Sequence, residues 1–140
     1  MKEIESDKVV INNSQELIYN FLSNFNNFGK LMPEQIINWQ STDDTCSFTI
    51  KGLTDLSMKI KEKTPFDQIV IESDGKVPFT FELKWFFKEV ELNKTETQLI
   101  FLADLNAMMS MMVSKPLQNF VNILIAKLKE LIESPGFSTI

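Results

Sequence analysis

The chain is 140 residues long, 44% hydrophobic and 24% charged, with a formal net charge of −5 at pH 7. This composition is ordinary for a folded globular protein and excludes an intrinsically disordered chain, and the length suits one domain over residues 1–140. The acidic balance argues against a nucleic-acid partner, because such a partner normally requires a basic face or stripe.

The sequence contains no recognisable signal for membrane insertion or secretion. No stretch approaches the roughly 18 uninterrupted apolar residues of a membrane span, so stable membrane insertion is not expected. The N-terminal MKEIESDKVVI lacks the basic start and the apolar stretch of a secretory signal, which leaves the cytoplasm as the default expectation. Cys46 is the only cysteine, so an intramolecular disulfide and a cysteine-based metal cluster are excluded.

The first part of the chain predicts a strand followed by two short helices. Residues 3–11 end in the apolar run VVI and lead into a turn at Asn12 and Asn13. Ser14 is a candidate N-cap for a helix. The apolar residues after it repeat at helical spacing: Leu17, Ile18, Phe21, Leu22 and Phe25. A second helical turn with Phe28, Leu31 and Met32 is expected before Pro33.

From residue 36 to residue 105, apolar residues recur at every second position, which predicts strands. Six runs are separated by turn residues: IINWQS (36–41), CSFTI (46–50), LSMKIKEK (56–63), QIVIES (68–73), FTFELKWFFKEV (79–90) and TQLIFLADL (97–105). An antiparallel meander is the simplest way to connect them, and the first strand makes seven. The alternation of apolar and polar residues predicts a sheet with only one covered face.

The element predicted to cover this face of the sheet is a long C-terminal helix. The segment NAMMSMMVSKPLQNFVNILIAKLKELI places its apolar residues on one stripe: Val113, Leu117, Phe120, Val121, Leu124, Leu128 and Leu131. Pro116 lies inside it, and we expect one continuous helix that is kinked there. The methionines at 108, 109, 111 and 112 suit either ordinary core packing or the lining of an apolar pocket and its mouth.

Catalytic chemistry is poorly represented. The chain has no histidine, which excludes Ser-His-Asp and Cys-His catalysis, and its four glycines are too dispersed for a phosphate-binding loop. No cofactor and no metal site are predicted. In CSFTI, Cys46 alternates with Phe48 and Ile50, which favours a buried apolar role over a reactive thiol. A carboxylate with a raised pKa remains an option, and Glu62 is the named candidate.

The order of these elements resembles the helix-grip fold of the START-like, or SRPBCC, superfamily, which includes pollen-allergen proteins, lipid-transfer domains and polyketide cyclases. The pieces that carry the resemblance are VVINNSQELIYNFLSNFNNF, NWQSTDDTCSFTIKG, PFTFELKWF and LNAMMSMMVSKPLQNFVNIL. Together they look like the orphan branch of small bacterial members. The implied α+β fold has a seven-stranded curved antiparallel sheet, two short helices after the first strand, and a long C-terminal helix packed over the concave face.

The resemblance also implies an apolar cavity between the concave face and the final helix. It would bind or transport a hydrophobic small molecule or a lipid without catalysis. The residues expected on or near its walls are Cys46, Phe48, Met58, Ile60, Phe81, Leu83, Trp85, Phe101, Met109, Val113, Leu117, Phe120 and Leu124. The cyclase members rely on polar or ionisable residues inside the cavity, and here only Cys46 and Glu62 are candidates for such a position.

Two alternatives stay open at this stage. The first is a protein-interaction module whose cavity is filled by its own side chains, since the chain has twelve phenylalanines. Such a module could form a homodimer through Phe86, Ile100 and Leu102 on the outer face of the sheet. The second is a cyclase, dehydratase or hydrolase that uses carboxylates, Tyr19 or ordered water.

Overall fold

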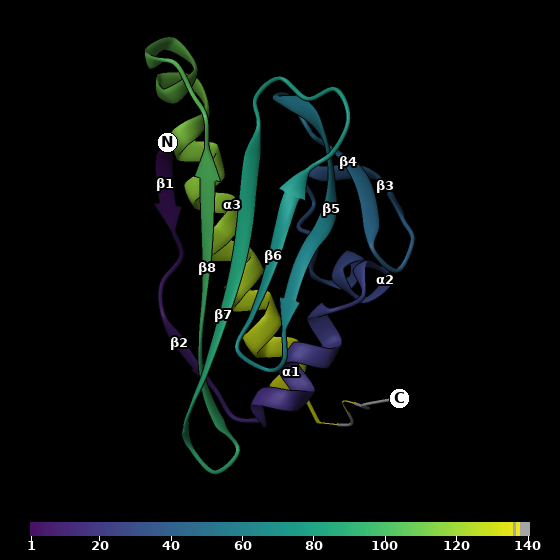
Figure 1. Cartoon of the computed structure of the whole chain (residues 1–140), viewed down its shortest axis with the longest axis vertical. Coiled ribbons are helices and arrows are strands. Elements are labelled where there is room, and N and C mark those ends of the chain that lie inside the picture. Colours follow the sequence, from purple (N-terminus) through teal and green to yellow (C-terminus); the bar gives the residue numbers. More distant parts are fainter. Residues whose placement is uncertain (136, 138–140) are drawn as a thin grey trace.

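The computed structural model describes residues 1–135 and residue 137, and it consists of one antiparallel sheet covered on one face by helices (Figure 1). Eight strands make up the sheet: β1 (Lys2–Glu5), β2 (Val9–Ile11), β3 (Ile36–Ser41), β4 (Thr45–Ile50), β5 (Thr54–Thr64), β6 (Gln68–Ser73), β7 (Phe81–Glu91) and β8 (Lys94–Ala103). The strand order is β1-β8-β7-β6-β5-β4-β3, and β2 also pairs with β8. The predicted meander from β3 to β8 is confirmed.

The first predicted strand is broken into β1 and β2, although both occupy the same edge position beside β8. Glu5 pairs with Ile100 and Val9 pairs with Thr97, so residues 6–8 face only residues 98–99. This bulge changes the alternation of side chains along the strand. Ile4 and Ile11 have opposite parity in the sequence, yet both are buried in the core. The sheet therefore has seven positions, as predicted, with one broken strand.

Ser6 holds this bulge together. It is 5% exposed, and its N–H donates to the carbonyl oxygen of Leu99 at 2.8 Å. The Leu99 N–H in turn donates to the Ser6 Oγ at 2.9 Å. The serine side chain thus replaces a backbone acceptor at the point where the ladder is interrupted.

The two short helices follow as predicted: α1 (Gln15–Leu22) and α2 (Phe25–Phe28), the second continued by the 3₁₀ turn η1 (Gly29–Leu31). The Ser14 Oγ accepts the Leu17 N–H at 3.1 Å, which confirms the N-cap. Asn24 caps α2 in the same way, with its side chain accepting from Asn26 N–H at 2.8 Å.

The C-terminal helix α3 (Ala107–Glu133) is continuous through Pro116. Proline lacks the N–H that would bond to the carbonyl four residues earlier, which is Met112 here. Pro116 and Met112 are both exposed. Water can therefore satisfy the carbonyl, and the helix does not have to end. At its start, the Asn106 side chain accepts the Met109 N–H at 2.8 Å.

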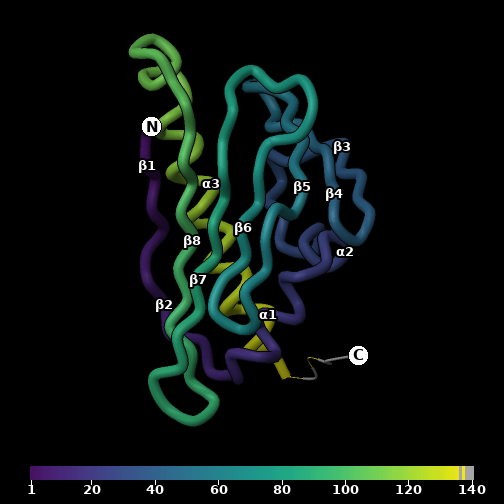
Figure 2. The backbone as a smooth tube through the Cα atoms, viewed as in Figure 1, coloured from purple at the N-terminus to yellow at the C-terminus, as the bar shows by residue number. Residues whose placement is uncertain are grey.

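The backbone trace shows α3 running diagonally behind the sheet, with α1 and α2 beside its C-terminal half (Figure 2). Its apolar stripe faces the sheet, and the buried members include Val113, Leu117, Phe120, Val121, Leu124, Ile125, Leu128 and Ile132. Among the described residues, no helix is long and apolar enough to span a membrane.

Polar side chains tie α3 to the β1–β2 edge of the sheet. The Gln118 Nε2 donates to the Glu5 carbonyl at 2.7 Å, and the Lys129 Nζ donates to the Val10 carbonyl at 2.6 Å. Near the end of the helix, the Asn12 N–H donates to the Glu133 carboxylate at 2.8 Å. These three contacts all lie on the C-terminal side of Pro116.

Candidate functional site

The candidate site is the inner face of the sheet, which is the face covered by α3. All thirteen predicted wall residues belong to one core cluster or pack against it. Eleven of them are buried, whereas Ile60 and Met109 are half-buried. Trp85 and Phe81 lie on this inner face, as the strand alternation predicts, and are 0% and 2% exposed. Every one of the thirteen is apolar except Cys46.

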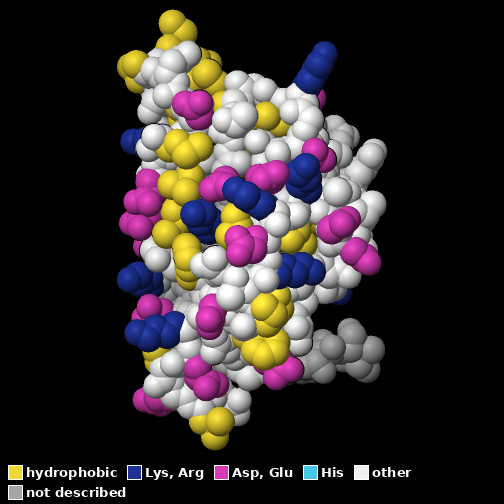
Figure 3. All heavy atoms as spheres, in the orientation of Figure 1, with side chains coloured by type: hydrophobic (Ala, Val, Ile, Leu, Met, Phe, Trp, Pro, Cys, Tyr) yellow, Lys and Arg dark blue, Asp and Glu magenta, His cyan; other side chains and the backbone are white. Residues whose placement is uncertain are grey.

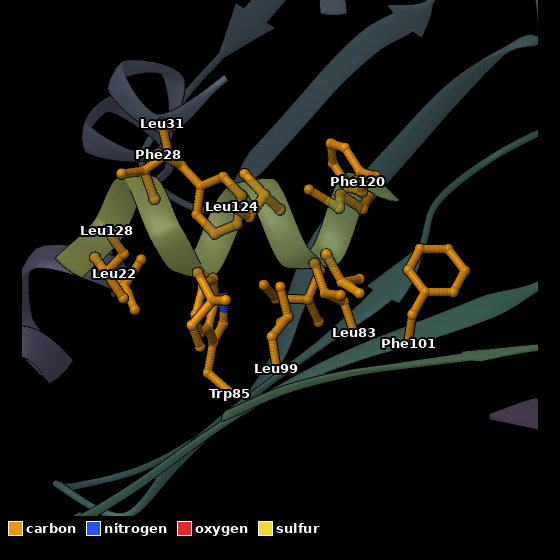
Figure 4. Close-up of a cluster of buried hydrophobic side chains, with 14 of the residues drawn as sticks. Leu22, Phe28, Leu31, Leu83, Trp85, Leu99, Phe101, Phe120, Leu124 and Leu128 are labelled. Carbon is orange, nitrogen blue, oxygen red and sulfur yellow. The ribbon is translucent and has the colours of Figure 1, made fainter. Parts of the chain in front are cut away.

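Trp85 lies at the centre of the site. Figure 4 shows Leu83, Trp85 and Leu99 extending from β7 and β8 toward α3, where Phe120, Leu124 and Leu128 meet them. The ring of Phe28 packs edge-on against Trp85, with ring centroids 6.0 Å apart. Leu99 is the cross-strand neighbour of Trp85.

A row of aromatic rings fills the space between the β3–β4 end of the sheet and α3. Phe28 of α2 stacks on Trp39 of β3 at 6.3 Å, and Trp39 stacks on Phe48 of β4 at 5.7 Å. Phe48 then stacks on Phe120 of α3 at 6.2 Å. These distances join ring centroids, and offset stacking at such distances is favourable. In the described structure this part of the site is therefore occupied by the protein's own side chains.

Sequence reasoning missed two members of this row, Phe28 and Trp39, as site residues. Ile36 and Trp39 both face the core although their parity differs, because the register of β3 against β4 shifts between Ile37 and Gln40. Asn38 has φ of 57° within this shift. Asparagine tolerates this left-handed conformation better than most residues. Asn38 was therefore the feature of the sequence that could have indicated the register shift.

The Trp85 indole Nε1 is a buried hydrogen-bond donor for which the described structure provides no partner. Figure 4 shows this nitrogen, in blue, among carbon atoms beneath α3. Leaving such a donor unpaired costs about 1–3 kcal/mol, and most buried polar groups in folded proteins are paired.

The first turns of α3 lie at one end of the site and contain four methionines. Met108, Met111 and Met112 are 72%, 88% and 63% exposed, whereas Met109 is half-buried against the core and Val113 is buried. Of the two roles considered for these methionines, core packing is wrong for the three exposed ones. The first turns of α3 therefore present apolar side chains both to solvent and to the core.

Glu62 does not lie in the site. The register of β5 against β6 shifts between Ile60 and Glu62, so that Glu62 pairs with Val70 instead of continuing the inward series of Met58 and Ile60. Its side chain is exposed. Strand parity alone would have turned this carboxylate inward, and the bulge is the physical reason that it faces solvent.

Cys46 is buried on the inner face and pairs across the strands with Met58. Burial raises the pKa of the Cys46 thiol well above its ordinary value, because a thiolate would lose its hydration there. The thiol form is unreactive as a nucleophile.

The outer face of the sheet is mostly polar, with one apolar strip. The ion pairs Lys61–Glu82 at 2.9 Å and Lys59–Glu72 at 3.8 Å lie over β5–β7. Figure 3 shows apolar side chains gathered along β8, beside acidic side chains over β1. The strip contains the half-buried residues Phe86, Ile100 and Leu102.

A separate open groove of about 370 Å³ lies beside α1. It is lined by Ser14, Glu16, Leu17, Asn20, Phe21, Asn27, Lys30 and Phe137. This groove lies outside the inner face, and no residue of the predicted wall lines it. The sequence contained no pattern that predicts it.

Several solved structures are similar to this chain over nearly its whole length. A START superfamily protein from Mycobacterium smegmatis matches with a TM-score of 0.74 and 15% identity, covering 94% of this chain and 97% of that chain. The Aha1 dimer from Colwellia psychrerythraea matches with a TM-score of 0.64 and 18% identity, covering 95% and 97%. The di-domain ARO/CYC BexL from the BE-7585A biosynthetic pathway matches with a TM-score of 0.68 and 14% identity, covering 96% of this chain and 48% of BexL.

No protein-family model and no curated protein sequence matches the chain. The assignment of the fold therefore depends on architecture. The matches to the structures named above extend over 94–96% of this chain, so they include the sheet, the paired short helices and the long final helix. This chain has the helix-grip fold of the START-like, or SRPBCC, superfamily.

Proposed function

We propose that this protein binds an apolar small molecule or a lipid, without catalysis, between the inner face of the sheet and α3. The observation that carries the proposal is the group of methionines at the first turns of α3, where Met109 packs against the core and its neighbours Met108 and Met112 are exposed. Ligand sites are mostly apolar and contain few polar groups, and the inner face has this character.

The attachment of α3 supports an access route at this end. The side chains that bond α3 to the sheet edge, Gln118 and Lys129, follow Pro116 in the chain. The turns before Pro116 contain the exposed Met108, Met111 and Met112. Proline also removes one helical hydrogen bond at the boundary between the two parts. The first turns of α3 can therefore move while the second half stays attached.

The described structure corresponds to the closed form. Side chains such as Phe48 and Phe120 occupy the inner face, so a ligand must displace them or shift α3. Methionine side chains suit this role because they are flexible and adapt to different apolar partners.

The proposal is tested with N-phenyl-1-naphthylamine, a probe whose fluorescence rises in an apolar site. We expect saturable binding of about one molecule per chain. Val113→Trp places a bulky ring at the inner end of the access route and should weaken binding at least tenfold. Leu92→Trp is the matched control, because Leu92 is 85% exposed on the β7–β8 turn, and it should leave binding unchanged.

Absence of saturable binding, or equal binding by the two tryptophan variants, would contradict the proposal. Native mass spectrometry of the purified protein, followed by extraction with organic solvent, provides a second readout. A stoichiometric apolar compound released from the protein would support the proposal and give the ligand class.

A second candidate function is a protein-interaction module, and the stacked rings that fill the inner face favour it. The partner that we propose is a second copy of this chain, bound through the outer-face strip of Phe86, Ile100 and Leu102. Ile100 and Leu102 pair with Glu5 and Glu3 of β1 on one side. On the other side they pair with Lys84 and Glu82 of β7.

The strip therefore has the acidic Glu3 and Glu5 along one border. Along the other border, Lys61 and Lys84 both lie beside Glu82 and exceed it in charge by one. A two-fold axis through the strip would place the acidic border of one copy over the lysines of the other. The similar Aha1 structure is described as a dimer. Sedimentation velocity measures the oligomeric state: Phe86→Lys should dissociate the dimer. The outer-face control Ser47→Lys, on β4 and away from the strip, should not. A monomeric wild type, or a dimer that survives Phe86→Lys, would exclude this surface.

A further inference from the structure

We infer that the ligand of the inner face has a neutral hydrogen-bond acceptor, such as a ketone oxygen, that binds the indole Nε1–H of Trp85. This inference rests on the proposed binding function and specifies its ligand chemistry. It assigns Trp85 as the residue that orients the ligand, in a site that otherwise provides only apolar contacts.

The first step is the state of the donor. Trp85 is 0% exposed, and its Nε1 has no hydrogen-bond partner among the described residues. An indole nitrogen can only donate, so it requires an acceptor nearby. In folded proteins an unpaired buried donor is rare, and it indicates an additional group such as a water, an ion or a ligand.

The second step is the surroundings. The neighbours of Trp85 across the strands are Leu99 and Ile69, and the ring of Phe28 packs against it. These side chains offer no acceptor. Replacing the indole by phenylalanine would fill much of the same apolar space without introducing a donor. The donor therefore serves no packing purpose at this position.

The third step concerns the chemistry of the acceptor. The thirteen wall residues provide no cationic side chain that could compensate a buried carboxylate, and burying an unpaired charge is strongly unfavourable. A neutral oxygen accepts one hydrogen bond at a much smaller desolvation cost. The ligand class is therefore an apolar molecule with a ketone, ester or ether oxygen.

The test compares 2-acetylnaphthalene with 2-isopropenylnaphthalene, which have nearly the same shape and differ in a C=O or C=CH₂ group. We expect the ketone to bind about tenfold more tightly to the wild type, as one neutral hydrogen bond allows. Trp85→Phe should remove this preference by weakening only the ketone. Trp39→Phe, which removes the other indole, should retain it.

The ¹⁵N spectrum of the wild type gives a readout that requires no variant. The two indole N–H signals belong to Trp39 and Trp85. On addition of 2-acetylnaphthalene, the Trp85 signal should move downfield as the hydrogen bond forms, and 2-isopropenylnaphthalene should not cause this shift.

Three outcomes would overturn the inference, and they can be distinguished. If neither compound binds, the proposed function fails and the inference fails with it. If both bind with equal affinity and the Trp85 signal does not move downfield, only the inference fails. If the Trp85 N–H shows a persistent contact with a bound water after the ketone is added, that water is the partner and the inference is wrong.

Discussion

Phe48 of β4 and Phe120 of α3 stack with ring centroids 6.2 Å apart and an angle of 24° between their planes. The backbone of α3 runs closest to β1, β2 and β8. This ring pair therefore connects the helix to a strand that lies farther from its backbone. The two rings therefore set the distance between α3 and β4.

Truncating this connection should destabilise the protein strongly. Phe120→Ala removes a 3%-exposed ring and leaves a void, for which a loss of about 3–5 kcal/mol in the free energy of unfolding is typical. Urea denaturation measures the loss. Leu92→Ala, on the exposed turn, should change stability by less than about 0.5 kcal/mol. Similar small losses for both variants would mean that the Phe48–Phe120 pair is not formed in solution.

Gly29 should not tolerate a side chain, for a reason that depends on Trp39. A Cβ at Gly29 would lie 2.7 Å from the Trp39 Nε1, which is closer than non-bonded atoms can approach. Gly29→Ala must therefore push Trp39 out of its stack with Phe28, at a cost of about 1–3 kcal/mol. Denaturation midpoints measure this cost.

The matched control is Gly29→Ala combined with Trp39→Leu, compared with Trp39→Leu alone. With the indole absent, the alanine should cost much less. An equal cost in both backgrounds would show that Trp39 is not the obstacle.

Ser6→Ala should destabilise the protein through the bulge between β1 and β2. The variant leaves the buried Leu99 N–H without its acceptor, which costs about 1–3 kcal/mol. Ser47→Ala on β4 is the control and should cost less than about 0.5 kcal/mol. Hydrogen exchange of the Leu99 amide is a direct readout, since it should speed up in Ser6→Ala. Unchanged exchange would contradict the contact.

The Lys129–Glu133 pair should produce a defined pH dependence. The hydrogen bond from Lys129, aided by the Asn12 N–H, lowers the pKa of the Glu133 carboxyl in the folded state. Its stabilisation is therefore full above the unfolded pKa of about 4.3 and is lost as the pH falls through the lower folded value. The magnitude is at most about 1 kcal/mol, because the pair lies at the surface.

The measurement is the difference in unfolding free energy between the wild type and Glu133→Gln. It should be largest near pH 6 and should shrink toward pH 3. Glu130→Gln, three residues earlier on the same helix and with an exposed side chain, is the control and should show little pH-dependent difference. A difference for Glu133→Gln that is constant across this range would contradict the interaction.

The element order and the apolar stripe of α3 could be predicted because they depend on hydrophobic periodicity, which the core requires. Positions such as Trp85 and Phe120 follow from that periodicity alone. Three local irregularities could not be predicted in this way. The register shifts near Ser6, Asn38 and Lys61 each reverse the inward side of a strand.

Those shifts explain which parts of the site were misjudged. Trp39 was not assigned to the inner face, and Glu62 was considered as a possible inward carboxylate, because alternation was assumed to continue unbroken. The exposure of Met111 was also not readable from its residue type, since a methionine suits a core and a surface contact equally well. Whether such a methionine is buried or exposed depends on tertiary packing, which the periodicity of the sequence does not reveal.

The pairing of β1 with β8 also has a consequence for synthesis of the protein. Ile4 pairs with Phe101, and Gln118 of α3 bonds to the β1 backbone still later in the chain. Contacts between such distant residues form slowly, because a long loop must close first. On the ribosome, β1 must therefore wait with an unpaired edge until β8 has emerged.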